Sequence, residues 1–298
     1  MLALIFVSVL WAFSFGLIRH HLVSLDSSVV AWLRLVLSLL VFSPWLRPSS
    51  LGRWHCSWLM FIGAVQFGVM YLLYVASFAY LQAYQVAVLT LLTPLFICLF
   101  DAVLERRFSW VALAAAVLAA VGAMIIVASR PLGRAEWQGV LLIQLSNGAF
   151  ALGQLLYRRF RRSHSNLVDR HLIPWLYLGA TLIAFPFAAG KLVPTCSSLS
   201  PAQALVILYL GVGASGVGFF LWNSGAAQVK ASVLSVMNNA KIPLGVLVSL
   251  LVFGESSNPL RLVCGALVVL LAAVLAERET ITIVTAPAKS GVVGRSRG

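Results

Sequence analysis

The sequence predicts an all-α integral membrane protein, with ten transmembrane helices arranged as two inverted five-helix repeats. Three observations lead to this fold class. Of the 298 residues, 61% are hydrophobic and only 10% are charged, whereas soluble domains carry about 25% charged residues. Apolar runs of about 20 residues, long enough to cross a hydrocarbon core, alternate with short polar segments. The two halves of the chain also resemble each other in sequence.

Ten apolar runs are the predicted transmembrane spans. They cover residues 2–18, 28–46, 57–79, 85–104, 108–128, 138–157, 171–190, 202–224, 230–253 and 260–276. No basic residue precedes the first run and no small-residue cleavage site follows it, so we expect a retained span and not a signal peptide. The chain divides into a first repeat (1–128), a linker (129–137), a second repeat (138–277) and a cytoplasmic tail (278–298). From residue 280 on, we expect the tail to be mostly disordered.

Short matching segments support the internal repeat. WAFSFG (11–16) matches GAFALG (148–153), VAVLT (86–90) matches ASVLS (231–235), and Pro94 and Glu105 match Pro243 and Glu255. Since each copy holds an odd number of spans, the two copies must have opposite orientations in the membrane. Inverted repeats are typical of secondary transporters, whose substrate site lies near the midplane where the repeats meet. The sequence has no GxxxxGK[ST] phosphate loop, so ATP is not the expected energy source.

We attribute the formal net charge of +13 to basic residues in the cytoplasmic loops of a membrane protein. Cytoplasmic loops are enriched in Lys and Arg, and most basic residues fall on the side of the two termini, so both termini are predicted to be cytoplasmic. We interpret the basic island from Arg158 to Arg170 as an anchor for this orientation and not as a nucleic-acid site. The four cysteines show no CxxC pair and no metal-binding spacing. Cys56 and Cys196 are predicted on opposite sides of the membrane and therefore cannot pair.

A family resemblance rests on the ends of spans four and nine. They read TPLFICLFDAVLERRFSW (93–110) and IPLGVLVSLLVFGESSN (242–258), and Gly122 and Gly265 follow in small-residue spans. Arg34 and WAFSFG also fit. Over nearly its whole length the chain resembles EamA-type members of the drug/metabolite transporter superfamily, and within it YddG-type amino-acid exporters.

This resemblance implies a secondary transporter in the bacterial inner membrane. It would export amino acids (aromatic or other neutral ones) or similar small metabolites by alternating access. Export of another metabolite or drug of the same superfamily is the alternative, and a channel is a more distant one. The expected partners are a small-molecule substrate and the lipid bilayer, with no nucleic acid. We expect a monomer or a weak homodimer.

Lys241 is the first candidate for substrate binding. Ser235, Asn238, Lys241, Gly245 and Ser249 are three or four residues apart and share one helical face. An ammonium at mid-membrane costs about 2.5–3.5 kcal/mol on insertion scales, so we expect Lys241 to bind a substrate carboxylate, with Asn238 and Asn239 beside it. The alternative is a structural lysine that bonds to carbonyls at the Pro243 kink.

The remaining candidates are polar and aromatic residues of other spans. The expected substrate-binding residues are Thr90, Thr93, Gln144, Asn147, Trp11, Gln66 and Tyr74, and the expected gate residues are Tyr80, Tyr84, Trp222 and Asn223. Hydrogen bonds between helices are the alternative role for the polar groups. An interfacial aromatic belt is the alternative for the gate. We expect Arg34 to extend its long side chain to the outer membrane surface, and Asp101 to pair with a nearby arginine.

Enzymatic function is not expected. The histidines His20, His21, His55, His164 and His171 fall in loops or at span ends, and Asp101 is the only acid inside a predicted span. Metal-assisted or acid–base chemistry needs HExxH, paired carboxylates or a Ser/His pair at one site. We therefore expect no cofactor and no metal. Because proton-driven carriers use buried acids or histidines, facilitated or exchange transport is preferred over proton coupling.

Overall fold

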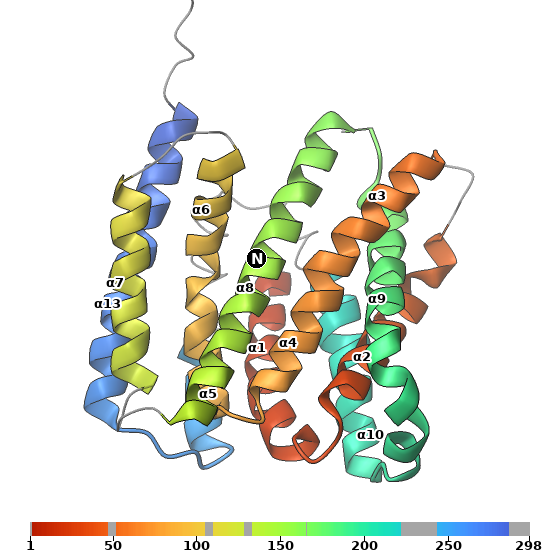
Figure 1. The fold of residues 1–298 in the computed structure, drawn as a ribbon, viewed down its shortest axis with the longest axis horizontal. Coiled ribbons are helices and arrows are strands. Elements are labelled where there is room, and N and C mark those ends of the chain that lie inside the picture. The colour runs from red at the N-terminus through yellow and green to blue at the C-terminus, as the bar shows by residue number, and fades with distance from the viewer. Residues whose placement is uncertain are drawn as a thin grey trace, which may run out of the picture.

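The computed structural model describes residues 2–46, 52–104, 110–127, 133–164, 166–221 and 243–285, and within these ranges every regular element is a helix (Figure 1). In the part of the chain that the structure describes, six helical segments are long and apolar enough to cross a membrane: Ile5–Leu22, Ser27–Trp45, Arg53–Ser77, Arg134–Ser163, Asp169–Ser197 and Pro201–Leu221. The all-helical architecture expected of an integral membrane protein is thus confirmed. The count of ten spans and the inverted repeat stay predictions.

The first two helices are joined at a capped turn. α1 (Leu2–Leu17) continues into the π-helical segment η1 (Ile18–Leu22), and α2 (Ser27–Phe42) follows. Asp26 caps α2, because its Oδ1 accepts hydrogen bonds from the backbone N–H groups of Ser28 (2.9 Å) and Val29 (3.3 Å). Burial alone would raise the pKa of Asp26, but these bonds and the ion pair with Lys191 (2.8 Å) outweigh it and lower the pKa. The cap is therefore lost only when the pH falls through this lowered pKa.

The helices at the third and fourth predicted spans are each built from three pieces, and we call them the third and fourth rods. α3 (Arg53–Gly63), the π-helical η4 (Ala64–Val69) and α4 (Met70–Ser77) form one continuous rod. After a turn, α5 (Ala83–Leu89), the 3-10 turn η5 (Thr90–Leu92) and α6 (Thr93–Leu104) form the next. We call the end of the bundle that holds His20, Tyr80 and Glu255 the outer end, after the predicted orientation.

Two long helices extend beyond their predicted spans. α8 covers Arg134–Ser163 and α9 covers Asp169–Ser197, where spans were predicted only at 138–157 and 171–190. Hydropathy marks the part of a helix inside the hydrocarbon, whereas backbone hydrogen bonding continues into the polar ends. At about 1.5 Å per residue, the 30 residues of α8 exceed the hydrocarbon thickness. Residues 134–137, predicted as linker, are therefore the first turn of α8.

The last elements complete the bundle. They are α7 (Trp110–Val127), α10 (Pro201–Leu208) with the π-helical η6 (Tyr209–Val217), a helical stretch over 243–251, and α13 (Pro259–Thr285). α13 continues past residue 277, so residues 278–285 of the predicted tail are helical. α7 and α13 lie side by side at one edge of the bundle (Figure 1). A Cβ added to Gly265 would lie 2.6 Å from the carbonyl oxygen of Gly122, so these two glycines bring the helices into backbone contact.

A second close crossing joins α3 to α9. A Cβ on Gly63 would lie 1.9 Å from the carbonyl oxygen of Leu176, and a Cβ on Gly179 would lie 1.9 Å from that of Met60. Any side chain at either position would collide with backbone. The pair therefore fixes α9 against the third helical rod, on the side of the bundle opposite α7 and α13 (Figure 1).

Candidate functional site

The fourth helical rod is broken at Thr90. The backbone N–H of Thr93 bonds to the Thr90 carbonyl in the 3-10 turn η5, instead of to Leu89 as in an α-helix. Pro94 has no N–H with which to reach the Thr90 carbonyl. The Thr93 hydroxyl donates to that carbonyl at 2.8 Å. The break thus presents the Leu89 carbonyl and the Thr93 hydroxyl to the neighbouring helix α8.

Asn147 of α8 occupies this break. Its Nδ2 donates to the Leu89 carbonyl at 2.8 Å, and its Oδ1 lies 3.2 Å from the Thr93 hydroxyl oxygen. Nδ2 also lies 3.2 Å from Oε1 of Gln144. Three predicted site residues of two different helices therefore form one partly buried network. The Thr90 hydroxyl instead bonds to Ala87 within its own helix, at 2.6 Å.

The amide of Gln144 is only half used. Its Oε1 accepts from Asn147, while its Nε2 is buried with no hydrogen-bond partner. Gln66, on η4, has a similar feature: the residue is 6% exposed and its Oε1 has no partner. Gln66 packs against α8 at Gly153, where a side chain would collide with it: a Cβ on Gly153 would lie 2.3 Å from Gln66 Cβ. A buried donor and a buried acceptor thus remain free at two points along α8, and unpaired buried polar atoms are uncommon.

Trp11 fits the structural role better than the binding role. Its indole Nε1 donates to the carbonyl of Ala214 in η6 at 2.8 Å, and its ring lies 5.1 Å from that of Phe219. Tyr209 strengthens the same helix pair by donating to the Leu10 carbonyl at 2.6 Å. These bonds hold α1 against η6.

The predicted tyrosines lie toward the outer end. Tyr74 packs edge-on against Phe78, with ring centroids 5.1 Å apart, and near Phe15 at 6.4 Å. Tyr80 is 39% exposed in the turn before α5, and Tyr84 is buried in the first turn of α5. The remaining predicted residues, Lys241, Asn238, Asn239, Trp222 and Asn223, lie outside the described residues, as does the side chain of Asp101.

The expectation for Arg34 is wrong. Arg34 is 5% exposed and points into the bundle, where its Nε donates to Ser215 Oγ at 2.7 Å. The reason is the close approach of η6: a Cβ on Gly211 would lie 2.6 Å from Leu37 Cβ and 3.2 Å from the Arg34 carbonyl oxygen. This brings Ser215 against α2, so the arginine meets a polar partner inside the bundle. Nη1 of Arg34 is buried and has no hydrogen-bond partner.

Aromatic and hydroxyl groups surround the Arg34 guanidinium. Its central carbon lies 4.3 Å from the centroid of the Tyr71 ring, within cation–π range. The Tyr71 hydroxyl lies 2.8 Å from Ser215 Oγ, and the Tyr177 hydroxyl donates to the Ser215 carbonyl at 3.0 Å. Ser38 ties the two backbones, donating to the carbonyls of Arg34 and Gly211. We call Arg34, Tyr71, Tyr177 and Ser215 the Arg34 cluster. Sequence analysis missed it because its members come from four separate segments.

A buried acid lies at the outer end. The Glu255 side chain is 2% exposed, and its two oxygens accept from the backbone N–H groups of Ala83 (2.8 Å) and Tyr84 (3.0 Å). Ser249 donates to the same carboxylate, and His20 Nε2 lies 3.7 Å from it. Glu255 was noticed only through its match to Glu105. That match was the signal available, although it did not reveal that the carboxylate caps α5.

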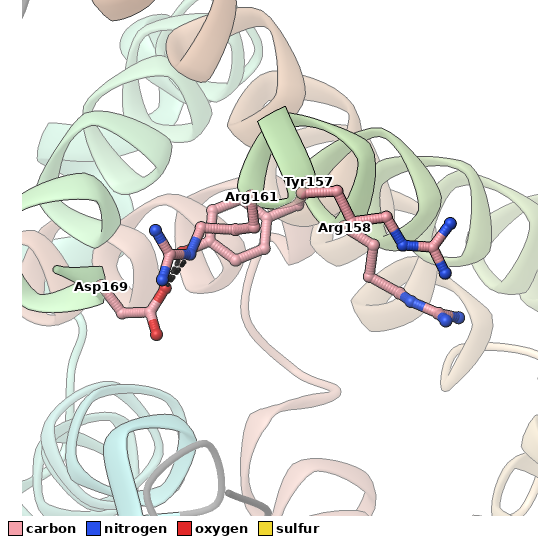
Figure 2. Close-up of a pocket in the computed structure, with 5 residues that line it drawn as sticks. Tyr157, Arg158, Arg161 and Asp169 are labelled. Atoms are coloured by element: carbon pink, nitrogen blue, oxygen red, sulfur yellow. Dashed lines mark hydrogen bonds and ion pairs between the residues drawn. The ribbon is translucent and has the colours of Figure 1, made fainter. Parts of the chain in front are cut away.

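The basic island folds as part of a shallow hollow of about 280 Å³ between α8 and α9, lined by Tyr157, Arg158, Arg161, Arg162 and Asp169. Figure 2 shows Arg161 turned toward Asp169, to which its Nε is paired at 2.9 Å, while Arg158 points away. Tyr157 donates to the same carboxylate at 2.5 Å. These bonds stabilise the turn between the helices. Among the described residues, no three His, Cys, Asp or Glu side chains gather as a metal site.

A helical bundle with a broken helix and buried, partly unpaired polar groups is an architecture that secondary transporters use. The model of the EamA-like transporter family matches residues 1–128 and 137–277, and the chain belongs to this family. It is therefore a transporter and not an enzyme.

Three bacterial relatives are similar over most of their length. A "Probable biotin transporter" of Pseudomonas aeruginosa is 39% identical over 272 residues, which cover 89% of this chain and 93% of that protein. A "Biotin transporter" of Salmonella typhimurium is 38% identical over 274 residues, with 91% and 90% covered. A "Biotin transporter" of Escherichia coli strain K12 is 37% identical over 276 residues, with 91% and 90% covered. One solved crystal structure shares the fold, with a TM-score of 0.61 at 17% identity over 95% of this chain and 97% of that chain.

Proposed function

We propose that this transporter carries biotin, or a small metabolite of the same chemistry, across the bacterial inner membrane. The observation that carries the proposal is the 37–39% identity to proteins named biotin transporters, over about nine tenths of both chains. The transport is by alternating access between two inverted repeats with cytoplasmic termini. The two separate matches of the family model, to 1–128 and 137–277, support the division into repeats.

The buried polar groups suit such a substrate by type. Biotin has a ureido ring, which offers N–H donors and a carbonyl acceptor, and an apolar chain that ends in a carboxylate. Gln66 Oε1 is a free buried acceptor, and Gln144 Nε2 is a free buried donor. The broken rod at Thr90 resembles the discontinuous helices at which transporters form substrate sites. Lys241, with Asn238 and Asn239, remains a proposed second site of contact for the carboxylate.

Amino-acid export, predicted from the sequence, is the rival substrate proposal. A neutral amino acid also brings a carboxylate, but adds an ammonium that needs acceptors inside the membrane. Among the residues that the structure describes, the buried carboxylate of Glu255 is already engaged by two backbone N–H groups. Biotin has no ammonium, and it therefore fits these groups better.

The proposal is tested in a bacterial strain that lacks its own biotin transport and synthesis. Cells that express the chain should take up tritiated biotin and, when preloaded, release it faster than cells with an empty vector. Excess unlabelled biotin should compete, whereas neutral and aromatic amino acids should not. Flux of amino acids with no flux of biotin would contradict the proposal. An imposed pH gradient should leave the initial rate unchanged, as expected for facilitated or exchange transport.

A further inference from the structure

Arg34 is a buried cation without a counter-ion in the part of the chain that the structure describes. Within those residues its guanidinium makes one hydrogen bond, from Nε to Ser215 Oγ, and Nη1 has no partner. Neutral partners alone surround it: the Tyr71 ring and hydroxyl groups. A charge buried in this way is costly unless it is paired. The uncompensated charge therefore favours an anion at this point.

The position of Arg34 in the membrane agrees with a ligand site. Arg34 lies seven residues after Ser27, the first residue of α2, which is about 10 Å along a helix. In the predicted orientation it thus lies inside the hydrocarbon layer and below the outer surface. Two of the segments near it, η4 and η6, are π-helical, a conformation that is frequent at functional sites.

Aromatic rings connect Arg34 with α1 and its neighbours. Tyr71, which lies under the guanidinium, is 6.3 Å from Tyr74, and Tyr74 is 6.4 Å from Phe15. A Cβ on Gly245 would lie 3.0 Å from the Phe15 ring and 3.7 Å from Ala87 Cβ. The rings therefore extend from a cation to the point where α1, α5 and the helix over 243–251 meet. This combination suits an apolar molecule with a terminal negative charge.

We propose that Arg34 is an anion-binding residue of this transporter, and that its free Nη1 receives the carboxylate of the substrate. Ser215 fixes the guanidinium through Nε, and Tyr71 supports its face, so that the remaining N–H groups are held ready. A planar guanidinium matches a carboxylate with two parallel hydrogen bonds. The inference rests on the proposed function, because it names the substrate group that Arg34 receives.

The test compares two ligands that differ only in charge. Biotin carries a carboxylate, and biotinamide replaces it with a neutral amide. The Kd of each tritiated ligand is measured on the purified full chain in chloride-free buffer. Wild-type protein should prefer biotin by about 25-fold or more, as expected when one partner of a buried charge pair is removed. In Arg34→Gln this preference should fall to about threefold or less, while biotinamide still binds.

Controls separate the outcomes. Arg53→Gln makes the same substitution at an exposed position on α3, and it should keep the wild-type preference. If Arg34→Gln binds neither ligand, Ser215→Ala is the deciding variant, because it releases the guanidinium without removing its charge. A preference for biotin over biotinamide that is reduced severalfold in Ser215→Ala supports the inference, and an unchanged preference overturns it. Full preference for biotin in Arg34→Gln also overturns it. If wild-type protein binds neither ligand, the proposed function fails instead.

Discussion

Glu255 accepts a hydrogen bond from the backbone N–H of Ala83 at 2.8 Å, and so joins segments 172 residues apart in the chain. Its second oxygen accepts from the N–H of Tyr84. The carboxylate thus caps the N-terminus of α5, where the helix dipole favours a negative charge. Through this one side chain, the segment after the predicted ninth span fixes the start of the fourth rod at the outer end.

Glu255→Gln should therefore lower the thermal stability of the purified protein. The amide keeps one acceptor but loses the charge and places an N–H beside the donors of α5. We expect a loss of about 1–2 kcal/mol, the range of a helix cap. Thermal unfolding in detergent measures it, and Ser256→Ala, at an exposed neighbouring position, is the control. A melting temperature equal to that of wild type would show that the cap contributes nothing.

Asn147→Leu should disrupt the break in the fourth rod. Leucine keeps the γ-branched shape of asparagine, although it is larger, and leaves the Leu89 carbonyl and the Thr93 hydroxyl without their partner. An unsatisfied buried group costs about 1–3 kcal/mol, so both stability and substrate flux per folded protein should fall. Gln138→Leu, an exposed position on the same helix, should change neither quantity. Wild-type flux in Asn147→Leu would remove Asn147 from the proposed transport site.

Cysteine labelling tests the predicted orientation. Ser163 ends α8 and Ser198 follows α9, so a helix of 29 residues separates them and places them at opposite ends of the bundle. In a background without the four native cysteines, a cysteine at 198 should react in intact cells with a membrane-impermeant maleimide. A cysteine at 163 should react only after permeabilisation. Reaction of both in intact cells would refute the topology, and the reverse pattern would invert it.

Lys241→Met tests the second proposed cation. Methionine keeps the length of the side chain and removes its charge, so packing should largely survive while biotin flux falls severalfold or more. Flux per folded protein in liposomes is recorded together with thermal stability. Lys241→Arg, which retains the charge, should keep much of the flux. Unchanged flux in Lys241→Met would demote Lys241 to a structural role.

The sequence was sufficient for the all-helical membrane class, because long apolar runs between short polar segments are typical of transmembrane helices. It placed Thr93 and Asn147 among the polar groups of two predicted spans, and the structure brings these two side chains together. Helix ends such as Ser163 were missed, since hydropathy does not follow a helix into polar surroundings.

The orientation of the Arg34 side chain could not be predicted from the sequence pattern. Its position on α2 is equally compatible with an inward and a lipid-facing side chain. The choice depends on Ser215, 181 residues away, and on the close approach that Gly211 allows. The π-helical segments near it likewise depend on packing between helices and leave no local signature in the sequence. For the same reason the function of Glu255 became visible only with α5 placed against it.

Counterflow in liposomes tests most directly whether this chain transports biotin. Purified protein is reconstituted into vesicles loaded with excess unlabelled biotin, and a trace of tritiated biotin is added outside. Exchange through the protein should accumulate label inside transiently, above the equilibrium level, and vesicles loaded with leucine or phenylalanine should show no such accumulation. Label that enters no faster than in protein-free vesicles, or tritiated leucine that accumulates against a leucine load, would contradict the account.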